Sequence, residues 1–258
     1  MIFGDLSYTQ WAAFLLILVR CAALLLTLPF FSSNNLPTMA KAGLALSLAI
    51  LLTGTVRVDP GSFPTKIWDF LLLLGAEAII GAILGLSVQL LMTSVQIMGQ
   101  LVGFQMGFAM ANVIDPVGGG QISVLAQLSY LMAILVMFTV NGHHWFFKTL
   151  ADSFALLPVG KVALTKNLFE QMMQISGEMF SLAIRLGAPV IGALLFTQVS
   201  MGILAKTVPQ MNILMVGFPI TITVGLIFLS LSMLVIIPML VKLFSNLGPV
   251  LAGLIKAM

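Results

Sequence analysis

The sequence predicts an all-α, polytopic, membrane-associated helical protein, and three observations support that prediction. Of the 258 residues, 60% are hydrophobic and only 7% are charged. Soluble proteins carry about 25% charged residues, so this chain has too few to form a water-facing surface. Several apolar runs reach the length of about 20 residues that a membrane-spanning helix needs. No stretch alternates polar and apolar residues for long, which argues against a transmembrane barrel.

The first predicted helix covers residues 9–31. Asp5 precedes this run and Arg20 lies inside it, whereas a cleavable signal peptide has positive charge before a short apolar core. We therefore expect a retained helix. A second predicted helix, over 39–56, ends at a polar link over 57–66 that contains two prolines and a glycine.

The remaining predicted helices follow the later apolar runs. They cover residues 67–101, 122–140, 145–157, 172–205 and 213–243. A second polar link, over 158–170, precedes the last two helices, and the segment KTVPQMN joins them.

Charge and cysteine content exclude two further possibilities. The net charge is +3, from eleven basic and eight acidic residues. This charge is too small and too scattered for a nucleic-acid-binding surface, so we expect no nucleic-acid partner. Cys21 is the single cysteine, which excludes a disulfide within the chain.

Polar side chains inside the apolar runs indicate surfaces that avoid lipid. Gln89, Gln96 and Gln100 recur at spacings of seven and four, which places them on one face of a helix. Such a stripe faces protein or water. It therefore either packs against partner helices, which is the more common case, or lines a wet path.

Two ionisable residues in the helices, Arg20 and Glu77, admit two interpretations. Ionisable groups at membrane depth are functional by default, which favours a proton relay. A relay normally needs a denser chain of titratable groups, so a structural ion pair, or separate pairs with partner chains, fits the sequence better. Lys41 and Asp69 are equally available as ion-pair partners.

The segment after residue 140 resembles neither an active site nor a metal site. His143 and His144 are adjacent, so on a helix they diverge by about 100°, and no further ligand is near. Asn141-Gly142 is a turn signal, which predicts a corner between helices with an imidazole pair at an interface. The partner-interface candidates are thus Arg20, Lys41, Glu77, Gln89, Gln96, Gln100, Asn141 and His143.

Nothing in the chain predicts an enzyme, a metal or a cofactor. The three glycines at 118–120 lack the Lys-Ser/Thr of a phosphate-binding loop and follow no predicted strand, so nucleotide binding is not expected.

The stretch GFQMGFAMANVIDPVGGGQ, residues 103–121, interrupts the apolar pattern. Methionine is adaptable enough to seal an irregular gap, glycine frees the backbone, and Asp115-Pro116 stops a helix. Non-helical backbone at membrane depth must be buried in protein or border water. Composition therefore leaves two interpretations, a plug or re-entrant segment and an ordinary interhelical loop. The candidate pore-loop residues are Gly103, Gln105, Met106, Gly107, Met110, Asn112, Asp115, Pro116, Gly118, Gly119 and Gly120.

This loop resembles the FliR family, the export-gate proteins of flagellar type III secretion, whose injectisome counterparts are the SctT proteins. The shared pattern is G-x-Q-x-G-x-x-x-A-x-x-x-D-P, which runs here from Gly103 to Pro116. Two further blocks support the resemblance over nearly the whole chain. They are Arg20 followed by Pro29, Pro37 and Lys41, and Asn141-Gly142-His143 followed by Ser153, Pro158 and Gly160. The flagellar branch fits better than the injectisome branch.

The resemblance implies a fusion of two partner folds, a FliP-like helical portion over 1–166 and a FliQ-like helical hairpin over 167–258. The family forms a closed, helically arranged channel with FliP and FliQ, and exported flagellar proteins pass through it. Residues 107–121 correspond to the family's plug, beneath a methionine-rich gasket formed mainly by FliP. Further implied partners are FlhB-like and FlhA-like export components and membrane lipid, with the protein in the bacterial inner membrane at the flagellar basal body.

Two other functions are compatible with parts of the sequence. A secondary transporter also contains broken helices at membrane depth, but it predicts matching interruptions in two related halves. The 103–121 stretch has no counterpart near residue 230. A structural membrane scaffold, with the loop as an interface strap, is the third hypothesis.

Overall fold

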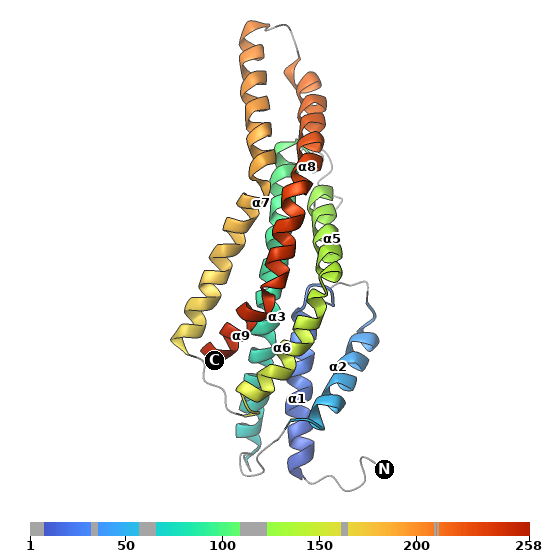
Figure 1. Cartoon of the computed structure of the whole chain (residues 1–258), viewed down its shortest axis with the longest axis vertical. Helices are drawn as coiled ribbons and strands as arrows, with labels where there is room; N and C mark the ends of the chain where they lie inside the picture. The colour runs from blue at the N-terminus through green and yellow to red at the C-terminus, as the bar shows by residue number, and fades with distance from the viewer. Residues whose placement is uncertain are drawn as a thin grey trace. The chain divides into compact units, whose positions relative to one another are not determined.

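The computed structural model describes residues 8–31, 36–56, 66–108, 123–160, 165–208, 210 and 212–258. Within these residues all regular structure is helical, which confirms the predicted fold class (Figure 1). The helices are α1 (Tyr8–Thr27), α2 (Thr38–Thr53), α3 (Ile67–Gln105), α5 (Val124–Thr139), α6 (Gly142–Leu156), α7 (Lys166–Thr207), α8 (Ile213–Ser245) and α9 (Leu247–Ala257).

The polytopic membrane character is also confirmed. In the described part of the chain, four helical stretches are long and apolar enough to cross a membrane, and a fifth follows if α5 and α6 form one broken span. Large apolar side chains on these stretches are exposed, including Leu72, Phe196 and Leu234 at 73%, 75% and 78%. Apolar surface of this extent belongs against lipid or against other subunits.

One helix was absent from the sequence prediction. The last predicted helix ended at residue 243, but α9 continues the chain as a separate helix with Asn246 at its N-cap. Gly248 and Pro249 resemble helix breakers in the sequence. Pro249, however, lies in the first turn of α9, where the missing N–H of proline would have no helical acceptor in any case. The predicted link over 158–170 is also shorter than expected, because α7 begins at Lys166. Thr165 caps this helix start by accepting a hydrogen bond from the Leu168 N–H at 3.2 Å.

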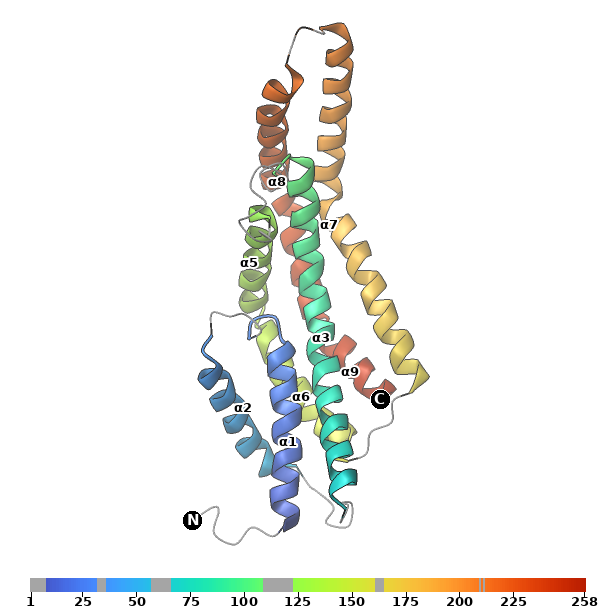
Figure 2. The ribbon, with the colours of Figure 1, turned by 180° about the vertical axis from the view of Figure 1, so that it is seen from behind.

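The chain divides into two compact units, of which the first comprises Met1–Leu90, Asn141–Ile175 and Asn246–Met258. Figure 2 shows α1 lying between α2 and the first part of α3 in this unit. Helix α6 packs against α9, where Trp145 covers Gly248. Thr165 donates a hydrogen bond from its hydroxyl to the Ala257 carbonyl, which fastens the start of α7 to the end of α9.

Two glycines allow α1 and α3 to approach closely in the first unit. A Cβ at Gly81 would meet the Arg20 carbonyl oxygen and would lie 2.9 Å from Ala23 Cβ, and a Cβ at Gly85 would meet the side chain of Thr27. Small residues four apart on one helix remove the bulk that would otherwise separate two backbones. This spacing brings the Arg20 position of α1 directly against α3.

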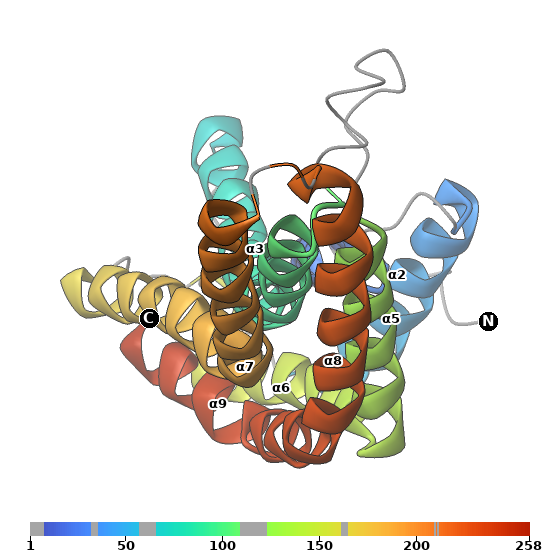
Figure 3. The same cartoon turned by 90° about the horizontal axis from the view of Figure 1, so that it is seen from above.

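The second unit comprises Leu91–Val140 and Ser176–Ser245. It contains the end of α3, most of α7, and all of α5 and α8. Figure 3 shows α7 and α8 side by side, with α5 along α8. Gly99 and Gly103 of α3 repeat the four-residue spacing and face the start of α5, where a Cβ would lie 2.6 Å from Ser129 Oγ and 2.5 Å from Ser123 Oγ, respectively. Gly103 is thus a packing residue inside α3.

Candidate functional site

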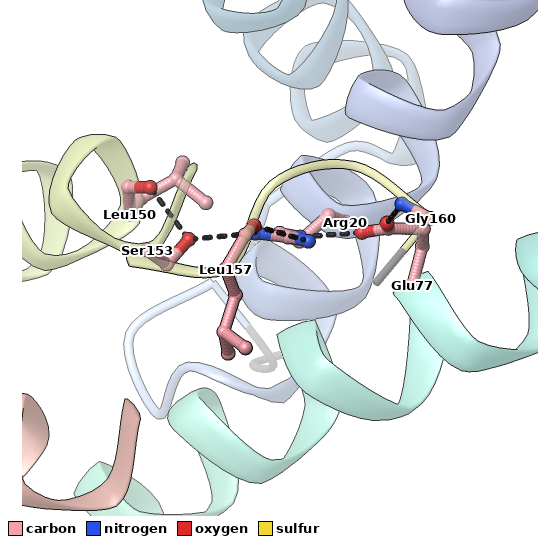
Figure 4. Close-up of polar contacts among 6 residues, drawn as sticks. All are labelled: Arg20, Glu77, Leu150, Ser153, Leu157 and Gly160. Carbon is pink, nitrogen blue, oxygen red and sulfur yellow. Dashed lines mark hydrogen bonds and ion pairs between the residues drawn. The ribbon is translucent and has the colours of Figure 1, made fainter. Parts of the chain in front are cut away.

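A buried ion pair joins α1 and α3 in the first unit (Figure 4). Arg20 of α1 and Glu77 of α3 are both 0% exposed, and Arg20 Nε donates to Glu77 Oε2 at 2.5 Å. The close approach of α1 and α3 at Gly81 makes this contact possible, because it brings the two backbones within side-chain reach. A buried charge pair is stable only if further hydrogen bonds satisfy its remaining donors and acceptors.

Those further bonds come from the end of α6 and the turn that follows it. The terminal nitrogens of Arg20 donate to the Leu157 carbonyl at 3.3 Å and to Ser153 Oγ at 3.2 Å. The Gly160 N–H donates to Glu77 Oε1 at 3.0 Å. Gly160 has φ +85°, a backbone conformation that favours glycine. The ion pair therefore holds the turn over 157–160 through both an acceptor and a donor of its backbone.

An aromatic ring completes the environment of the guanidinium. The Arg20 Cζ atom lies 4.2 Å from the centroid of the Phe154 ring. A cation over an aromatic face is stabilised by the ring quadrupole, most strongly where water is excluded. Arg20 is the largest fully buried side chain in the described residues, so each of its contacts acts in a desolvated site.

A second feature lies in the second unit, at the end of α3. Gly107 has φ +93°, its N–H donates to the Phe104 carbonyl at 3.1 Å, and the Phe108 N–H donates to the Gly103 carbonyl at 3.1 Å. These two bonds with a left-handed glycine form a Schellman motif, which ends an α-helix and satisfies its last carbonyls. Gly107 is therefore a helix-terminating residue, which is a more specific role than the general backbone freedom expected of it.

Helices α7 and α8 contact this helix end. Met106 is 0% exposed, and its side chain covers Gly225, where a Cβ would lie 2.6 Å from Met106 Cγ. A Cβ at Gly107 would lie 2.6 Å from the Phe218 ring. Gln198 Nε2 donates to the Gln105 carbonyl at 3.3 Å. The last turn of α3 is consequently fixed by side chains of both neighbouring helices.

The sequence comparisons identify the family. The family described as "Bacterial export proteins, family 1" matches residues 11–247 of the chain. This chain belongs to that family. Three flagellar biosynthetic proteins FliR are similar to it. The protein of Bacillus subtilis (strain 168) is 36% identical over 236 residues, which is 90% of each chain. The protein of Pectobacterium carotovorum is 33% identical over 98% of this chain and 97% of its own length, and that of Escherichia coli (strain K12) is 31% identical over 96% and 95%.

The match to the bacterial export family confirms the resemblance to FliR that the loop and the two flanking blocks predicted. It leaves the division at residue 166 as a prediction. Four of the candidate pore-loop residues lie in the described part of the chain, and the other seven do not. Gly103, Gln105, Met106 and Gly107 lie at the end of α3, whereas Met110, Asn112, Asp115, Pro116, Gly118, Gly119 and Gly120 lie outside the described residues.

The partner-interface candidates of this export-family chain fall into two groups. Arg20 and Glu77 expose no surface and satisfy each other within the chain, so the structural ion pair is the arrangement present and we no longer assign them to a partner interface. The others are at least partly exposed. They are Lys41, Gln89, Gln96, Gln100, Asn141 and His143.

The corner and the glutamine stripe have the predicted local geometry. Asn141 has φ +55° and stands at the N-cap of α6, and the rings of His143 and His144 contact edge to face at 4.3 Å between centroids. In the described residues, no three His, Cys, Asp or Glu side chains are grouped as metal ligands. Gln89, Gln96 and Gln100 all lie on the continuous helix α3.

Several residues of the two sites were missed by the sequence analysis. The close-packing glycines Gly81 and Gly85 carry a visible signal, because a G-x-x-x-G spacing in an apolar run indicates a helix-packing face. Phe218 and Gly225 of α8 carry no comparable signal. Their importance depends on contacts with residues more than 100 positions earlier in the chain, which local patterns do not encode.

Proposed function

We propose that this chain is a subunit of the export gate of flagellar type III secretion, through which unfolded flagellar proteins leave the cell. It acts in the bacterial inner membrane at the flagellar basal body and catalyses no reaction. The observation that carries the proposal is the family match over residues 11–247, together with the similarity to flagellar biosynthetic proteins FliR over at least nine-tenths of the chain.

The proposed partners follow from the family resemblance. FliP-like and FliQ-like subunits surround the chain, FlhB-like and FlhA-like components adjoin it, and the exported flagellar proteins pass through the assembly. In this arrangement residues 1–166 form the FliP-like portion and residues 167–258 the FliQ-like hairpin. The exposed apolar side chains of α3, α7 and α8 support the proposal, because such faces need other subunits or lipid to cover them.

We further propose that residues 107–121 plug the closed channel. The stretch combines methionine, which seals irregular gaps, with glycines that leave the backbone free. Two buried polar atoms near its ends, Gln105 Oε1 and Ser123 Oγ, have no hydrogen-bond partner within the described residues. Buried polar groups are rarely unsatisfied, so we expect this segment or a neighbouring subunit to satisfy them.

Shortening the segment tests this proposal. We expect a chain without residues 112–120 to assemble with its partners and to give a gate that conducts small ions when no substrate is exported. Proline at Gly118 restricts the backbone and should lower secretion of flagellar proteins, whereas alanine at Gly118 is the matched control that removes the same glycine without fixing φ. An assembled complex with a shortened segment and unchanged ion conductance would refute the plug and favour the scaffold hypothesis.

A further inference from the structure

Helix α8 presents three residues on one face to the end of α3. Phe218, Thr221 and Gly225 are three and four positions apart, so they lie along one stripe of the helix. Each contacts a different part of the last turn of α3. Phe218 faces Gly107, Gly225 faces the Met106 side chain, and Thr221 faces the Met106 carbonyl.

The Met106 side chain packs directly against Gly225 and occupies the space that a side chain at 225 would need. The Cβ of any larger residue at 225 would lie 2.6 Å from Met106 Cγ, 2.7 Å from its Sδ and 2.8 Å from its Cε. Because Met106 is 0% exposed, its side chain has little room to move away. The absence of a side chain at 225 thus determines how closely α3 approaches α8.

Polar contacts fix the backbone of the same turn. The Thr221 hydroxyl lies 3.2 Å from the Met106 carbonyl oxygen and 3.1 Å from the Gly217 carbonyl oxygen of its own helix, so its one proton serves either acceptor. Gln198 of α7 donates to the Gln105 carbonyl at 3.3 Å. The last carbonyls of a helix receive no hydrogen bond from an N–H of the same helix, so here Thr221 and Gln198 supply the donors.

We infer that Phe218, Thr221 and Gly225 form a fixed seat for the end of α3, and that Gly225 is a positioning residue of the export gate. Gly107 ends α3, and the seat fixes the position of that helix end against α8. It stays engaged whether the gate is open or closed. This inference rests on the proposed gate function, since a seat at this place matters only if the segment after it blocks the channel.

A disulfide tests the contact itself, independently of gating. A Cβ at 225 would lie 2.6 Å from Met106 Cγ, and Met106 Cβ is one bond from that Cγ, so the two Cβ atoms cannot be farther apart than the separation of about 3.5–4.5 Å at which disulfides form. We would place both cysteines in a Cys21→Ala background and oxidise the assembled complex. The matched control pairs cysteine 106 with cysteine 217, because a Cβ at Gly217 has only Met201 Cε within 4 Å.

We expect the 106–225 pair to crosslink and the 106–217 pair to remain reduced. Secretion of flagellar proteins and the resting ion conductance should be the same in the oxidised and reduced complexes. Failure to crosslink would overturn the seat, and a crosslink that blocks secretion would overturn its fixed position. Neither outcome depends on whether the shortened segment leaks ions, so the inference and the proposed function fail separately.

A substitution tests the positioning role. Gly225→Leu should displace Met106 and raise the resting ion conductance severalfold in an assembled complex, and Met106→Ala in the same chain should restore a low conductance by making room. Gly217→Ala is the control on the same helix and should change neither the position of Met106 nor the resting ion conductance. If Gly225→Leu assembles and stays as ion-tight as the parent chain, Gly225 does not position the gate.

Discussion

At the scale of single residues, the polarity of the Arg20–Glu77 pair follows from the backbone around it. Arg20 faces the carbonyl of Leu157, which can only accept a hydrogen bond, and Glu77 faces the N–H of Gly160, which can only donate one. A simple ion pair can exchange its charges between the two positions. This pair cannot, because each charge also serves a backbone group of fixed polarity.

Charge exchange therefore distinguishes a turn-holding pair from a simple one. Arg20→Met and Glu77→Gln should each destabilise the chain by about 3–5 kcal/mol, the cost of leaving one buried charge unpaired. The exchanged double variant, Arg20→Glu with Glu77→Arg, should remain as unstable as the single variants. The measurement is the temperature at which the purified complex loses half of its soluble chain. Recovery of the parent value by the exchanged variant would contradict the role in holding the turn.

At the scale of helices, glycine spacing controls which helices meet. In α3, Gly81 faces the backbone of α1 and Gly85 faces Leu24 and Thr27, whereas Gly75 has no atom within 4 Å of its ideal Cβ. A side chain at Gly81 would meet the Arg20 carbonyl and one at Gly85 would meet the Leu24 carbonyl oxygen at 2.9 Å, and neither backbone atom can rotate away. Gly81 and Gly85 are thus both sensitive to an added side chain, whereas Gly75 is not.

Alanine substitutions in α3 should reveal this difference. Gly81→Ala forces α1 away from α3 and should cost about 1–3 kcal/mol, the usual range for overpacking. Gly75→Ala should be neutral or stabilising by about 1 kcal/mol, because alanine favours a helix interior more than glycine does. Thermal stability of the assembled complex measures both. Equal effects of the two substitutions would show that close packing does not govern the α1–α3 contact.

The helices themselves were predictable, and their long-range partners were not. Hydropathy located every described helix except α9, because a helix that crosses a membrane needs a long run of apolar residues and such runs are visible in the sequence. The sequence placed Asn141 at a corner, since asparagine tolerates its φ of +55°. It did not pair Arg20 with Leu157, which lies 137 positions away. The sequence also predicted backbone flexibility at Gly107, whereas in the structure this glycine adopts a left-handed conformation that ends α3.

At the scale of the whole molecule, the chain leaves much of its apolar surface uncovered. Exposed Leu, Ile, Phe and Val side chains extend along α3, α7 and α8, with Phe104 at 69% and Phe196 at 75%. Lipid can cover such side chains, but it cannot satisfy polar groups among them. Gln100 is exposed on α3, and the buried Gln89 Oε1 has no hydrogen-bond partner in the described part of the chain. An amide left unsatisfied in an apolar environment costs several kcal/mol, so other subunits are the expected source of its partners.

Co-expression tests this requirement directly. Produced alone in a bacterial membrane, the chain should be degraded or should aggregate in mild detergent, because its exposed apolar faces then have no protein to cover them. Produced with FliP-like and FliQ-like subunits, it should be recovered in a single stable complex. The double variant Gln96→Leu, Gln100→Leu separates the two roles left open for the glutamine stripe. If the stripe contacts partner helices, the variant should lower recovery of the complex, and if it lines a wet path, recovery should be unchanged while secretion falls. A well-behaved monomer of the unmodified chain would argue against membership of a multi-subunit gate, since such a monomer would have no need of the partners that the gate supplies.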